Sequence, residues 1–173
     1  MRTSLVVTFT GSDRPGIVDA LSRVVTEHNG NWERSRMARL AGRFAGILEV
    51  TADEPHASTL AQALGRLPGL TVLVDRNAPA EPVAGDRWLR LHVTGQDREG
   101  IVREVAGILA SRRVNVEDLS TETESAAMSG ERLFRAQAEL RCPPELDLAD
   151  LRRALERLSN ELLVDIDVDE NHR

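Results

Sequence analysis

A short segment that combines an aspartate, an arginine and a glycine with the start of a helix occurs twice in this sequence. Residues 10–18 read TGSDRPGIV and residues 94–102 read TGQDREGIV, so seven of the nine positions are identical. Apolar residues at helical spacing follow each glycine and predict a helix there. The first amides of a helix suit an anion, because they lack partners within the helix and carry partial positive charge. With the aspartate beside it, such a site would suit a zwitterion that carries a carboxylate and an ammonium group.

The candidate binding residues fall at matching positions in the two copies. Asn31 and Asn115 follow the two segments at the same offset of 84, and their amide side chains can both donate and accept hydrogen bonds. The predicted ligand-binding residues are Asp13, Arg14, Pro15, Gly16, Ile17, Val18 and Asn31 in the first copy, and Asp97, Arg98, Gly100, Ile101, Val102 and Asn115 in the second. A purely structural alternative stays open, in which the aspartate caps the helix and the asparagine serves its own turn.

The repeat extends along the chain and predicts two small domains. The residues 64–67 match 155–158 at an offset of 91, so the second copy holds seven additional residues, which we assign to the turn-prone segment 125–130. A stretch rich in proline, alanine and glycine near residue 80 has no apolar period and predicts a linker. We therefore expect a first domain at 1–77, a linker at 78–86 and a second domain at 87–173.

Each copy has the order strand, helix, strand, strand, helix, strand. In the first copy we expect strands at 5–10, 32–40, 44–51 and 70–74, one helix that begins in the 13–15 turn and a second that begins at Pro55; in the second copy we expect strands at 88–94, 115–123, 133–140 and 162–168 and helices at 100–112 and 148–158. This order predicts an α+β fold of two ferredoxin-like domains, each an antiparallel four-stranded sheet with both helices on one face. Strand two of each copy should be an edge strand, which invites pairing with another strand or with a second chain as a homodimer.

Composition and charge exclude several classes of function. All 22 cationic residues are arginine, which excludes lysine Schiff-base chemistry and the lysine of phosphate-binding loops. The net charge of −6 disfavours direct nucleic-acid binding. We find no set of residues for acid–base or nucleophilic catalysis, no metal-ligand spacing among the histidines, and no apolar run that could span a membrane. A cytoplasmic, non-catalytic protein without cofactor or metal is expected, and the single cysteine, Cys142, favours a reducing compartment.

The DRPGIV segment after the first strand, followed by Asn31 at the start of the second strand, resembles the ACT domain family. That resemblance implies a regulatory module that binds an amino acid where two domains abut, between the strand-one loop of one and the strand-two start of the other. Two such domains in tandem resemble the glycine cleavage system transcriptional repressor family, which implies sensing of Gly or Ser and regulation of transcription or metabolism through a partner protein. The alternative is an assembly module that binds no ligand.

Three features depart from the resemblance or stand outside it. Gly11 and Gly95 stand where many binding members carry a polar side chain, and Glu99 replaces the usual proline in the second copy. Four arginines crowd the first hairpin, and we interpret them as a solvated strand face rather than a nucleic-acid site. These arginines are Arg34, Arg36, Arg39 and Arg43.

Overall fold

The computed structural model describes residues 2–76, 86–125, 132–162 and 164–170. Its contacts divide the chain into two compact units, Met1–Glu81 and Pro82–Arg173, which we call the first and the second domain. Most of the predicted linker and all but one residue of the segment 125–130 lie outside the described residues, so the limits 1–77, 78–86 and 87–173 stay a prediction.

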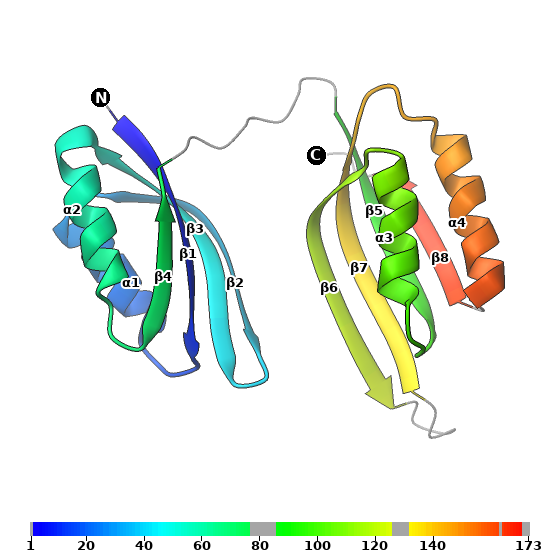
Figure 1. Ribbon diagram of the computed structural model, residues 1–173, viewed down its shortest axis with the longest axis horizontal. Helices are drawn as coiled ribbons and strands as arrows, with labels where there is room; N and C mark the ends of the chain where they lie inside the picture. The colour runs from blue at the N-terminus through cyan, green and yellow to red at the C-terminus, as the bar shows by residue number, and fades with distance from the viewer. Residues whose placement is uncertain (1, 77–85, 126–131, 163, 171–173) are drawn as a thin grey trace. The chain divides into compact units, whose positions relative to one another are not determined.

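The first domain has the predicted element order. Its elements are β1 (Arg2–Ser12), α1 (Ile17–Glu27), β2 (Asn31–Leu40), β3 (Arg43–Asp53), α2 (Glu54–Gly65) and β4 (Leu70–Asp75). The strands form one sheet in the order β2-β3-β1-β4, in which every neighbouring pair is antiparallel. Both helices lie on the same face of this sheet (Figure 1).

The second domain repeats the arrangement. Its elements are β5 (Arg87–Gln96), α3 (Ile101–Ser111), β6 (Asn115–Ser125), β7 (Arg132–Cys142), α4 (Leu148–Leu162) and β8 (Val164–Glu170). The sheet order is β6-β7-β5-β8, again with antiparallel neighbours, and α3 and α4 cover one face (Figure 1). The predicted α+β fold of two tandem ferredoxin-like domains is therefore confirmed.

The helices follow from the spacing of their apolar residues. In α1 the buried residues are Ile17, Leu21 and Val25, and in α3 they are Ile101, Val105 and Leu109. A spacing of four places each set on one stripe of its helix, which packs on the sheet. In each domain the stripe begins directly after a glycine with positive φ, so the turn and the buried face are set by adjacent residues.

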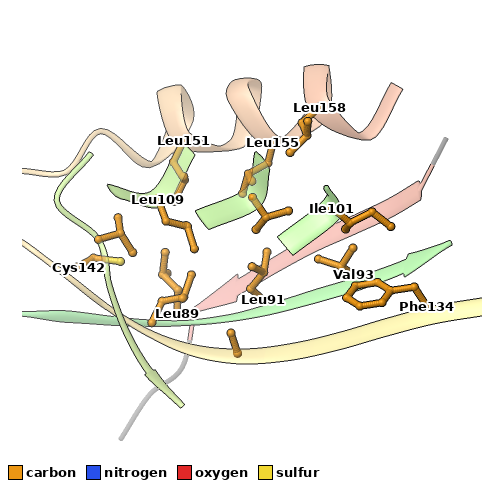
Figure 2. Packing of buried hydrophobic residues seen from close by; sticks show 14 residues of the cluster. Leu89, Leu91, Val93, Ile101, Leu109, Phe134, Cys142, Leu151, Leu155 and Leu158 are labelled. Carbon is orange, nitrogen blue, oxygen red and sulfur yellow. The ribbon is translucent and has the colours of Figure 1, made fainter. Parts of the chain in front are cut away.

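Each domain has its own apolar core between sheet and helices. In the second domain, Leu151, Leu155 and Leu158 on α4 point toward the sheet, and they form one cluster with Leu89 and Leu91 of β5 (Figure 2). In the first domain the core includes two aromatic rings, Phe9 and Phe44, whose centroids lie 5.9 Å apart. The two clusters of buried residues share no member among the described residues.

The second strand of each domain, β2 or β6, is an edge strand, as predicted. Each carries a β-bulge at the same place, between Trp32 and Arg34 in β2 and between Val116 and Asp118 in β6. Their charges differ. The β2 strand holds Arg34, Arg36 and Arg39 with one carboxylate, Glu33, whereas the β6 strand holds Glu117, Asp118, Glu122 and Glu124 and no cation.

Candidate functional site

In the first domain, Gly16 occupies the cap position directly before α1. This residue has φ 88°, a left-handed conformation that glycine adopts without the steric cost that a Cβ brings, and α1 begins at the next residue, Ile17. The Gly16 carbonyl accepts the first helical hydrogen bond, from the Ala20 amide at 2.9 Å. No side chain caps this helix, so the alternative role for Asp13 as a helix cap is wrong. The physical reason is that Asp13 lies three residues before the cap position and its carboxylate is engaged elsewhere.

Five of the predicted residues line one open cleft of about 240 Å³ at this helix start. The lining residues are Asp13, Arg14, Gly16, Ile17, Val18, Asp19 and Phe44. The predicted Pro15 is not among them. The structure adds Asp19, in the first turn of α1, and Phe44, at the start of β3, which the sequence analysis missed. Asp19 was detectable from its place in the first helical turn, whereas only the strand register brings Phe44 to the cleft.

Three polar contacts hold the loop around this cleft. The Asp13 Oδ2 lies 2.6 Å from Nε of Arg39, which reaches it from β2, and the Asp13 amide donates to the Gly42 carbonyl at 2.9 Å. The Arg14 Nη2 donates to the Pro68 carbonyl at 2.9 Å. The loop is therefore joined to the β2–β3 hairpin on one side and to the turn before β4 on the other. Arg39, which we assigned to a solvated strand face, is indeed exposed and also forms an ion pair with Asp13.

The corresponding loop of the second domain has the same backbone conformation at its glycine, but its side chains form different ion pairs. Gly100 has φ 96° and α3 begins at Ile101 without a side-chain cap. The Asp97 Oδ2 lies 3.4 Å from Nε of Arg132, and Arg98 pairs with Glu104 at 3.3 Å. Beside this loop, Ile101 and Val102 line an apolar groove that runs between α3 and the sheet.

The asparagines lie at the other end of each sheet from these loops. Asn31 is paired with Thr51 of β3, which in turn is paired with Ser4 of β1. The loop leaves β1 at Ser12, eight residues further on. At about 3.3 Å per residue this is roughly 26 Å along the strand. Asn31 and the α1 start of one domain therefore cannot contact one small ligand, and the register places Asn115 in the same way in the second domain.

Each asparagine donates to a glutamate two residues along its own strand. The Asn31 Nδ2 lies 2.9 Å from Glu33 Oε1, which also accepts a hydrogen bond from the Thr51 hydroxyl at 2.6 Å. These two bonds, the Thr51 bond most, lower the pKa of the Glu33 carboxyl from its ordinary value. In the second domain Asn115 Nδ2 lies 2.6 Å from Glu117 Oε1.

Other chemistry is sparse in the part of the chain that the structure describes. Cys142 is fully buried, and burial raises the pKa of its thiol to about 11, which disfavours a role as a nucleophile. Among residues 2–76, 86–125, 132–162 and 164–170, no group of three or more histidines, cysteines and carboxylates is arranged to hold a metal ion. No helix in those ranges is long and apolar enough to cross a membrane.

Comparison with known proteins identifies the family of the first domain. The profile of the ACT domain family matches residues 3–71. The chain is also 27% identical over 164 residues to the glycine cleavage system transcriptional repressor of Escherichia coli (strain K12), which covers 91% of this chain and 85% of that protein. The first domain is an ACT domain, and the chain is a tandem ACT-like protein.

Two solved structures support the tandem ACT-like architecture. One, a protein of unknown function from Galdieria sulphuraria, is 36% identical, covers 99% of this chain and 100% of its own, and superposes with a TM-score of 0.87. The other, described as a candidate glycine cleavage system transcriptional repressor, is 21% identical, covers 100% and 99%, and has a TM-score of 0.71. Both structures therefore share the tandem fold of this chain over nearly its whole length.

Proposed function

We propose that this tandem ACT-like protein is a non-catalytic regulator that binds a small amino acid, such as Gly or Ser, in the cleft at the start of α1. The observation that carries the proposal is the cleft itself, in which a helix start and two carboxylates, Asp13 and Asp19, line one space. A ligand carboxylate at the amides of Ile17 and Val18 would meet the positive end of the helix. The ligand ammonium group would face Asp19, and Phe44 would limit the room for a side chain.

The relatives support a regulatory role for the whole chain. The Escherichia coli relative is named a transcriptional repressor. We infer that ligand binding in this protein is transmitted to a partner protein in the cytoplasm, because neither its net charge nor any helix or strand among the described residues favours direct contact with DNA. Within one domain Asn31 lies too far from the cleft, so the predicted contribution of Asn31 or Asn115 requires a second ACT domain whose β2-type edge is antiparallel to the first.

The test is calorimetric titration of the full chain with each amino acid, supported by thermal denaturation. A ligand that binds only the folded state should stabilise it by about 2.7 kcal/mol at 100 times its Kd. Asp19→Asn should weaken glycine binding at least tenfold, because it removes a carboxylate from the cleft. Glu27→Gln is the matched control, since it removes the same charge from the far end of α1 and should leave affinity unchanged.

A ligand-free assembly module is the second candidate, favoured by the exposed β2 and β6 edges. This candidate predicts that no amino acid binds in the calorimetric titration. Melting temperatures that stay flat across all amino acids at millimolar concentration, together with concentration-dependent sedimentation, would replace the ligand-binding proposal with this one.

A further inference from the structure

An apolar groove opens between α3 and the β6 side of the sheet in the second domain. The groove is a small cavity of about 40 Å³, and every residue that lines it is apolar. Its mouth is formed by three aliphatic side chains that stay exposed: Val102 at 46%, Val116 at 39% and Leu119 at 50%. Exposed aliphatic side chains beside unfilled apolar space indicate room for an apolar group from outside the domain.

The same space is filled in the first domain. Trp32 packs against the first core. It corresponds to Val116, because each is the last paired residue before the β-bulge of its edge strand. Leu48, which is fully buried, corresponds to Ala138, which lies on the groove wall.

A third replacement enlarges the groove. Phe9, whose ring packs against Phe44 in the first domain, corresponds to Val93. All three replacements in the second domain remove carbon atoms from the layer between the first helix and the sheet. One replacement adds carbon atoms, because Leu119 stands in place of Ser35. Its side chain lies half exposed at the mouth of the groove and does not fill the interior. The groove therefore results from the side chains and not from a change in the backbone.

We propose that this groove binds the aliphatic side chain of an amino acid, so that the second domain selects ligands of the valine and leucine class whereas the first domain selects small ones. The inference rests on the proposed function, because it takes an amino acid as the ligand. A polar side chain would find no hydrogen-bond partner on the groove wall and would lose those it makes to water. A cavity of this size holds only a few carbon atoms.

The groove is also continuous with the candidate ligand loop. Its wall includes Ile101 and Val102, the first two residues of α3, and both belong to the predicted ligand-binding set. An amino acid held at this loop would therefore have its side chain beside the groove. Each further methylene group buried there should strengthen binding about fourfold.

The experiment is a calorimetric series with glycine, alanine, valine and leucine on the full chain, with leucine also added to glycine-saturated protein. We expect affinity for a second site to rise from alanine to leucine, and leucine to bind without displacing glycine. Val116→Trp and Ala138→Leu restore the first-domain side chains, and each should reduce leucine affinity at least tenfold and leave glycine binding unchanged. Leu73→Trp, on the outward face of β4, is the control that should change neither.

The possible failures are distinguishable. If glycine binds but the aliphatic series shows no trend, the groove proposal is overturned and the proposed function stands. If no amino acid binds, both are overturned. If the groove-filling variants abolish self-association in sedimentation and have no effect on leucine, a second copy occupies the groove and the aliphatic-ligand proposal is wrong. Should both variants fail to fold by circular dichroism, the wild-type series and the leucine addition still decide the matter.

Discussion

In the first domain Trp32 and Leu48 lie between the first helix and the sheet, whereas Val116 and Ala138 occupy those places in the second. The strand order, the positive-φ glycine and the buried stripe of the first helix are the same in both. The buried stripe of the first helix and the glycine turn before it therefore maintain the fold. The side chains nearest the edge strand vary between the domains without changing it. This variable layer is where the ligand preferences that we propose for the two copies would differ.

The largest change in the free energy of unfolding should come from exchanging one core residue between the domains. Leu48→Ala should cost about 2–5 kcal/mol, because it removes a fully buried side chain from a filled layer. Ala138→Leu should change stability by at most about 1 kcal/mol and in the stabilising direction, because the groove accepts the added carbons. Urea denaturation of both variants measures this difference, and equal losses would show that the second-domain layer is as tightly filled as the first.

The thiol at Cys142 offers a second contrast, since Ala52 holds the corresponding position in the first domain. Because burial raises its pKa to about 11 from an ordinary value near 9, roughly a hundredfold less thiolate is present at neutral pH. Labelling by a thiol reagent should therefore be at least a hundredfold slower in the native protein than in urea, and should speed up as pH rises toward 11. Equal rates would mean that the second domain opens readily. Cys142→Ala, which does not react, controls for other sites.

Alanine at the two helix-start glycines should have a smaller effect. Gly16→Ala and Gly100→Ala each place a Cβ on a residue with positive φ, at a cost of about 1–2 kcal/mol. A Cβ at position 16 meets nothing within 4 Å, but at position 100 it lies 3.2 Å from the Glu104 carboxylate. Thermal denaturation should therefore show a somewhat larger loss for Gly100→Ala. A larger loss for Gly16→Ala would contradict this account.

The smallest expected effect is on the pKa of Glu33 and on its contribution to the stability of the first domain. Its lowered folded-state pKa means that its ionised form stabilises the domain above the unfolded pKa of about 4.3 and that this contribution is lost as pH falls through the folded pKa. Asn31→Ala removes one hydrogen bond to the carboxylate and should raise the Glu33 pKa, and Thr51→Val should raise it further. An NMR titration of the Glu33 carboxyl carbon follows both shifts. No change in Asn31→Ala would mean that the bond does not persist in solution.

Much of the fold was predictable because it rests on local patterns. The repeated segment, the apolar and β-branched composition of strands such as Leu5–Thr10 and the spacing in α1 and α3 led to the observed topology. The bulge in β2 was not predictable, because nothing in the strand's alternation marks an extra residue. Simple alternation would place Trp32 with Arg34 and Arg36 on one face, whereas the bulge puts Trp32 on the same face as Ser35 and Met37.

The candidate site was predictable in part. Asp13, Gly16 and Val18 are close in sequence, so their shared cleft follows from one loop. Arg39 and Phe44 reach that loop only through the pairing of β2, β3 and β1, which distant residues determine. The second-domain groove depends on three side chains from different strands, and their combined volume cannot be assessed before their register is known.

The charge difference between the two edge strands has a consequence for the behaviour of the protein at high concentration. Two β6 edges that approached each other would bring their four carboxylates each, including Glu122 and Glu124, into close opposition. Repulsion at that contact should keep second domains from joining into extended, aggregating sheets at low ionic strength. Near 1 M salt the screening distance falls to about 3 Å, so the acidic edge would lose this protection.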